Sequence, residues 1–90
     1  MNKAELIAAV SQNAGLAAPE VRKVLDAVLQ TVSSALKDGA EVRLVGFGTF
    51  STLYRPAGPA RNPRTGEAVR RPAVRTVRFR AGEGLRRNLN

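Results

Sequence analysis

The chain has 90 residues and a formal net charge of +8, and it contains neither cysteine nor histidine. A domain of this length buries only roughly 60–65% of its unfolded surface, so a single copy is marginally stable. Without these two residue types the chain has no disulfide, no common zinc ligand set and no Ser-His or Cys-His pair, and only seven carboxylates remain. The composition therefore argues against an enzyme, a metal site or a bound cofactor.

The N-terminal sequence lacks the features of an export signal. No charged segment is followed by an apolar core, and no apolar run approaches the roughly 18 residues that cross a membrane. The lack of cysteine agrees with a reducing compartment. We therefore expect a soluble cytoplasmic protein with no membrane partner and no small-molecule substrate.

Two helices are predicted first. Asn2 and Glu5 form an approximate capping box for a helix that ends at Gly15. The second helix begins near Pro19 and carries apolar residues at spacings of three and four as far as Gly39. This apolar stripe is wide for a helix with one short neighbour, so we expect part of it to contact a second subunit; ordinary core is the alternative.

After residue 40 the apolar period changes to two. Val42 and Leu44 alternate with charged residues, and the Gly46-Phe47-Gly48 turn leads into a second strand through Phe50. This pattern predicts a β-hairpin. A nucleotide-binding loop is the weaker interpretation, because a third glycine and a GKS or GKT sequence are both absent.

A further strand and a short helix are predicted near the C-terminus. In residues 74–80, Val77 and Phe79 alternate with Thr76, Arg78 and Arg80, which places the arginines on a solvent face. Residues 82–89 form a short helix in which Leu85 and Leu89 are expected to face inward, with Arg86 and Arg87 outside.

The positive charge is concentrated in one part of the chain. Residues 1–54 carry five basic and five acidic side chains, whereas residues 55–90 carry ten arginines against two glutamates. Arginine is suited to bidentate binding of phosphate groups. The distribution indicates a polyanionic partner.

Residues 56–72 hold four prolines and almost no large apolar side chain, so they cannot form core. We expect two extended legs that project from the body and are joined by a turn near residues 62–66. A disordered basic loop is the alternative.

Three stretches together resemble the signature of the HU and integration host factor family: Gly46-Phe47-Gly48-Thr49-Phe50, Arg55, and Ala60-Arg61-Asn62-Pro63-Arg64-Thr65-Gly66. The similarity continues over essentially all 90 residues without gaps. It implies an α+β fold, an intertwined homodimer of an N-terminal helical hairpin and a three-stranded antiparallel sheet, with long β-ribbon arms and a short C-terminal helix. The implied parts of this single domain are a helical dimerisation part (1–39), a sheet or saddle (40–54 and 74–81), an arm (55–73) and a terminal helix (82–90).

The same resemblance implies a nonspecific, nucleoid-associated protein that bends, wraps and compacts double-stranded DNA through arms in the minor groove. Pro63 at the arm tip is expected to intercalate between base steps, held in place by Arg61 and Asn62. The other expected DNA contacts are Arg64, Arg70 and Arg71 along the arm with Arg55 at its base, and Arg75, Arg78 and Arg80 on the saddle, assisted by Lys3 and Arg86. The resemblance also implies a dimer core containing Phe47, Phe50 and Phe79, and Lys3 close to Asp26.

The chain departs from the family pattern at a few positions. Pro56, Gly58 and Pro59 at the foot of the arm predict a stiffer and less charged base, with Arg70 and Arg71 moving charge further along the returning leg. Glu83 occupies a place often held by lysine, which weakens any saddle contact there.

Three other functions compete with this interpretation. A sequence-specific subunit like integration host factor, reading DNA through its deformability, is the nearest alternative. An RNA-binding protein is less favoured, because the few aromatic residues are assigned to core and leave no platform for unstacked bases. A small nuclease would need a metal-binding carboxylate cluster.

Overall fold

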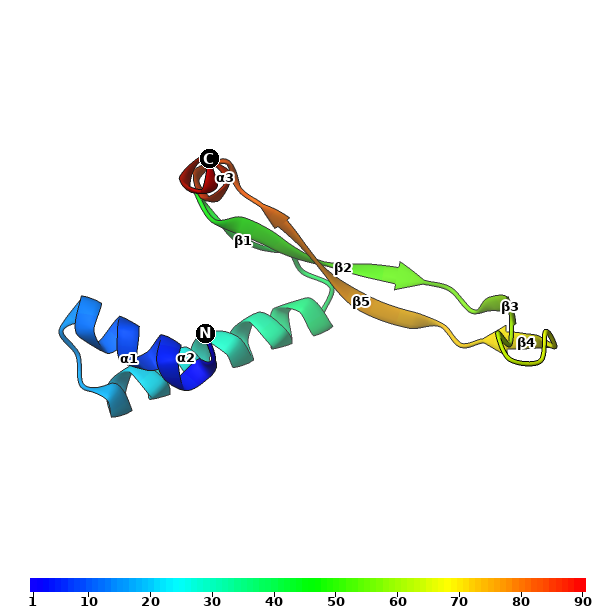
Figure 1. Cartoon of the computed structure of the whole chain (residues 1–90), viewed down its shortest axis with the longest axis horizontal. Helices are drawn as coiled ribbons and strands as arrows, with labels where there is room; N and C mark the ends of the chain where they lie inside the picture. The colour runs from blue at the N-terminus through cyan, green and yellow to red at the C-terminus, as the bar shows by residue number, and fades with distance from the viewer. The chain divides into compact units, whose positions relative to one another are not determined.

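The computed structural model describes all 90 residues and consists of helices and antiparallel strands, so the predicted α+β class is confirmed (Figure 1). Residues 1–34 and 35–90 form two compact units. In chain order the elements are α1 (Lys3–Ala14), α2 (Ala18–Lys37), β1 (Val42–Leu44), β2 (Gly48–Arg55), β3 (Gly58–Arg61), β4 (Ala68–Arg71), β5 (Val74–Ala81) and α3 (Glu83–Leu89).

The helix ends follow the capping residues. The Asn2 side chain accepts a hydrogen bond from the Glu5 amide at 2.9 Å, and the Glu5 carboxylate accepts from the Asn2 amide at 3.4 Å, which completes the predicted capping box. Gly15 ends α1 in the left-handed conformation at φ 69°, also as predicted. α2 begins at Ala18, so Pro19 takes the second helical position and not the expected first.

Within the first unit an ion pair joins α1 to α2. Lys3 Nζ lies 2.5 Å from Asp26 Oδ1, as the family resemblance implied. Ile7 and Val21 are the buried apolar residues of this unit. Such limited burial gives the helix pair little hydrophobic stabilisation of its own.

The second unit contains a three-stranded antiparallel sheet in the order β1-β2-β5. The predicted hairpin of β1 and β2 is present, and its turn places Gly46 at φ 85°. β2 and β5 pair along their whole lengths, from Gly48 opposite Ala81 to Arg55 opposite Val74. This long ladder extends from the α3 end of the unit toward the arm (Figure 1).

Three phenylalanines meet on one face of the sheet. The Phe79 ring lies between Phe50, at a centroid distance of 4.8 Å, and Phe47, at 5.6 Å. Gly48 is buried beneath this ring, and a Cβ atom there would lie 2.4 Å from Phe79 Cζ and 2.7 Å from the Arg80 carbonyl oxygen. Only glycine leaves room for this approach.

Beyond the sheet the chain forms an ordered two-stranded ribbon. β3 pairs with β4 from Gly58 opposite Arg71 to Arg61 opposite Ala68, and residues 62–67 close the turn. The expectation of two extended legs joined by a turn is therefore confirmed, and the alternative of a disordered loop is not what the structure shows. Residues 56–73 are called the arm below.

The terminal helix differs from expectation in one respect. α3 is present, and Leu85 is partly buried as predicted, but Leu89 is 77% exposed. The expectation that Leu89 faces inward is wrong, because the helix ends at this residue and no element of its unit covers the side chain.

We expect Gly48→Ala to destabilise the protein by about 3 kcal/mol or more, because the added methyl group overlaps both the Phe79 ring and rigid backbone. Urea denaturation followed by circular dichroism measures this loss. Ser51→Ala on the same strand is the control and should change the stability by no more than about 0.5 kcal/mol. Equal stability of the two variants would contradict the packing described for Gly48.

Candidate nucleic-acid interface

The β2–β5 ladder sorts the arginines of the sheet by face. Directly opposed residues of an antiparallel pair share a face, and successive residues alternate between faces. Arg80 lies opposite Thr49 and Arg78 lies opposite Ser51, so these four side chains share the face opposite Phe79. Arg55 belongs to the same face by its position in β2.

Part of this face is hollowed into a small polar depression. Its lining residues are Glu41, Arg43, Thr49, Ser51 and Arg80. Guanidinium groups and hydroxyls together provide donors suited to phosphate oxygens. Glu41 is the one acidic group in this lining.

Arg43 is a basic residue of this face that was missing from the sequence-based set. It pairs with Thr49 in the β1–β2 ladder, which brings it to the same face as Arg80. The alternation of β1 predicts that Arg43 lies on the opposite face from Val42 and Leu44. Only the pairing register brings it next to the arginines of β5.

Arg75 does not join Arg78 and Arg80, so the expected saddle group of three is corrected to two. Its odd position places it on the Phe79 face, opposite Tyr54. Its Nη1 donates to the carbonyl oxygen of Lys37, the last residue of α2, at 3.0 Å. A cation at the C-terminal end of a helix satisfies a free carbonyl and interacts favourably with the helix dipole.

The arm tip is closed by its own hydrogen bonds. The Asn62 amide donates to the Glu67 carbonyl at 2.9 Å, and the Gly66 amide donates to the Asn62 carbonyl at 2.8 Å. The Asn62 side chain accepts from the Arg64 amide at 2.9 Å, across the exposed Pro63. Asn62 thereby fixes the turn that presents the Pro63 ring.

Arg61 also supports the tip. Its Nη1 donates to the Gly66 carbonyl at 3.3 Å, and the side chain remains exposed. Arg64 lies in the turn itself and is exposed. The geometry agrees with the expectation that Arg61 and Asn62 hold the tip.

The legs of the arm also have two faces. Arg61 and Arg70 lie on the same face, and both are exposed. Arg71 lies on the other face with Gly58, and its Nη2 donates to the Pro56 carbonyl at 3.2 Å. The Arg71 side chain therefore lies against the arm itself. A residue that contacts DNA is expected to point outward, so this position differs from the prediction.

Two further predicted contacts belong to neither the strands nor the arm. Lys3 belongs to the first unit, where Asp26 pairs with its charge. Arg86 lies exposed on α3, while its neighbour Arg87 is 3.8 Å from Glu83. No cluster of acidic, cysteine or histidine side chains suited to a metal ion is present, and no helix is long and apolar enough to cross a membrane.

An antiparallel sheet with one arginine-rich face and a basic two-stranded arm with an exposed proline at its tip define a β-ribbon protein that binds nucleic acid. The chain belongs to the bacterial DNA-binding protein family, whose model matches residues 1–90. Membership in this DNA-binding family confirms that the protein is not an enzyme.

Known relatives match over almost the whole chain. DNA-binding protein HU of Caulobacter vibrioides is 52% identical over 88 residues, which cover 98% of this chain and 96% of the relative. DNA-binding protein HRm of Rhizobium meliloti is 47% identical over 90 residues and the full length of both chains. The Anabaena HU of an HU–DNA cocrystal structure superposes with a TM-score of 0.89 at 40% identity, covering 99% of this chain and 97% of that one. These matches confirm the resemblance to the HU family.

Arg75 and Arg78 lie on opposite faces of β5, so we expect their replacement to have different effects on DNA binding. Arg78→Gln should lower the magnitude of the slope of log K against log salt for DNA binding by about 0.9 for each copy of the chain, because one phosphate contact is lost. Arg75→Gln should leave the slope unchanged, because its guanidinium is held on the Lys37 carbonyl. Fluorescence anisotropy with a labelled duplex measures both slopes, and equal losses would contradict the assignment of faces.

Proposed function

We propose that the protein binds double-stranded DNA with little regard for sequence and bends, wraps and compacts it as an architectural protein of the nucleoid. The observation that carries this proposal is the Pro63 tip on its basic ribbon, which continues into the arginine face of the sheet. The membership of a DNA-binding family and the similarity to an HU crystallised with DNA support it.

In this proposal the arm enters the minor groove. Pro63 is rigid and apolar and has no N–H group, so it can wedge between two base steps without burying an unpaired donor. Arg61, Arg64 and Arg70 supply exposed charge along the arm. The minor groove distinguishes little more than A·T from G·C pairs, so this contact carries low sequence specificity.

The arginine face of the sheet holds the DNA backbone near the base of the arm. Arg55, Arg78 and Arg80 share this face, and two hydroxyl residues of β2 lie directly opposite Arg78 and Arg80. These groups contact phosphates and sugars, which position the duplex without reading its sequence. Arg43 joins this surface, Arg86 adds exposed charge on α3, and Arg75 has a structural role at the end of α2.

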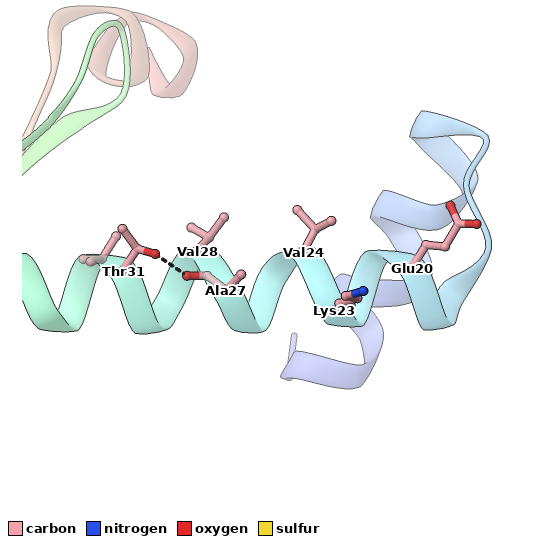
Figure 2. Close-up of a pocket in the computed structure, with 7 residues that line it drawn as sticks. Glu20, Lys23, Val24, Ala27, Val28 and Thr31 are labelled. Carbon is pink, nitrogen blue, oxygen red and sulfur yellow. Dashed lines mark hydrogen bonds between the residues drawn. The ribbon is translucent and has the colours of Figure 1, made fainter.

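The apolar surface of the single chain supports a homodimer. Ile7, Val21 and Leu36 are the only buried hydrophobic residues, and no large side chain is fully buried. An open apolar groove runs along α2 between Glu20 and Val32, and Val24 and Val28 point to the same side of the helix (Figure 2). A second copy covers such a surface in a closed, symmetric way.

The sheet contributes a second exposed apolar surface. Phe47 and Phe79 are 46% and 42% exposed although their rings contact each other. Phe47, Phe50 and Phe79 belong to the dimer core in this proposal, which removes them from solvent. The phenylalanines are then not free to stack on unpaired bases, which disfavours RNA as the natural ligand.

A cytoplasmic location at the nucleoid follows from the proposed ligand, because chromosomal DNA lies there. Recognition of one defined site, as for integration host factor, has no supporting feature on the arm, because the minor groove that the arm enters offers little sequence information to read.

Replacement of the tip proline tests the mechanism. Pro63→Ala should lose most of the DNA bending, because the wedge is gone, while the salt slope stays unchanged because no charge is removed. Fluorescence energy transfer between the ends of intact and nicked duplexes of several sequences measures bending, and a salt series gives the slope.

Pro59→Ala, which removes an exposed proline from the leg of the arm, is the matched control and should bend DNA as the unaltered protein does. Full bending by Pro63→Ala would rule out the wedge. A preference of about a thousandfold for one sequence would indicate a site-specific protein, and tighter binding to single-stranded RNA would indicate a different ligand.

A charge in the α2 groove tests the dimer. Val28→Asp should shift the protein toward monomer and lower its thermal midpoint, and that midpoint should rise with protein concentration. Sedimentation equilibrium and thermal unfolding at several concentrations measure both effects. Gln30→Asp adds the same side chain to the same helix outside the groove and should remain dimeric. A fully dimeric Val28→Asp would contradict this role of the groove.

A further inference from the structure

The arm contains a joint where the strand pairing stops on both legs. The long ladder ends at Arg55 opposite Val74, and pairing resumes at Gly58 opposite Arg71. Between them lie Pro56 and Ala57 on one leg and Pro72 and Ala73 on the other. Because proline has no N–H group, each leg lacks a ladder donor here. Figure 1 shows the break as a change from strand to coil between β2 and β3 and between β4 and β5.

One side chain bridges this joint. Arg71 is the last residue of β4, and its strand partner on the opposite leg is Gly58. Its side chain extends beyond Gly58 along that leg, where Nη2 donates to the Pro56 carbonyl at 3.2 Å. A carbonyl that has lost its ladder partner thus regains a donor. A charged donor makes this a stronger bond than one between two neutral groups.

The guanidinium of Arg71 is enclosed by the arm. Its Nε is buried and has no hydrogen-bond partner, so a phosphate oxygen cannot approach this atom. A Cβ atom on Gly58 would lie 3.3 Å from Nη2, so the lack of a side chain at Gly58 gives the guanidinium its place. The neighbouring Arg70 points to the other face with Arg61 and is exposed.

We propose that Arg71 is a positioning residue that braces the joint of the arm and does not contact DNA phosphates. By holding β3 and β4 against the end of the long ladder, it sets the direction in which the Pro63 tip is presented. Arg70, its neighbour in sequence, carries the charge that contacts DNA. This inference rests on the proposed DNA-bending function.

The brace is tested first without DNA. Nitrogen-15 relaxation of the isolated protein gives the order parameters of the Ala60, Gly66 and Val69 amides on the arm. In Arg71→Gln these values should fall below those of the unaltered protein, while amides of α1 and α2 keep their values. Arg70→Gln is the matched control and should give the unaltered arm values. Unchanged order parameters in Arg71→Gln would overturn the brace.

DNA binding then separates the two arginines. Arg71→Gln should bend end-labelled duplexes less while keeping the salt slope, because a support and not a phosphate contact is removed. Arg70→Gln should lower the slope magnitude by about 0.9 for each copy of the chain, which gives the reference value for a lost phosphate contact. An equal loss of slope in Arg71→Gln would show that Arg71 contacts DNA and overturn the proposal.

The two experiments also separate this inference from the function on which it rests. Failure of the unaltered protein to bind or bend DNA would refute the proposed function, and the order parameters of the free arm would still decide whether Arg71 braces the joint.

Discussion

The continuous β2–β5 ladder is the constraint on which the interface depends. Its register, from Gly48 opposite Ala81 to Arg55 opposite Val74, assigns every side chain to one of two faces. The phenylalanine cluster and Arg75, which caps α2, occupy one face, and Arg78 and Arg80 with the hydroxyls opposite them occupy the other. A slip of one residue would exchange these two surfaces. Gly48 helps to prevent such a slip, because only a residue without a side chain fits under Phe79.

Much of this architecture could be predicted from local sequence, because the interactions that create it are local. The capping box at Asn2 and Glu5, the left-handed Gly15 and the turn around Pro63 each involve residues within about one helical turn of one another. Strand alternation gave the strands of the sheet for the same reason. The family motif in residues 46–66 added the function, which composition alone restricted only to a polyanion-binding protein.

The failures concern contacts between distant residues. Sequence alone groups Arg75 with Arg78 and Arg80, although its partner, the Lys37 carbonyl, lies 38 residues away. The resemblance implies that Arg71 contacts DNA from the arm, but its side chain bonds to Pro56, which lies 15 residues away. Arg43 cannot be assigned to the interface from spacing, because its place on the same face as Arg80 depends on two pairing registers. Each case needed a partner whose identity no spacing rule supplies.

The tip turn differs from the rest of the arm in that its closing hydrogen bonds join only residues 61–67. Its shape therefore does not depend on the joint, the sheet or a second subunit. A wedge that is already formed before DNA binds loses little conformational entropy on insertion. Most of the entropy that the arm loses on binding is then lost by its two legs. Evolution can then change the reach and stiffness of the arm through those legs while the part that enters the base stack keeps its form.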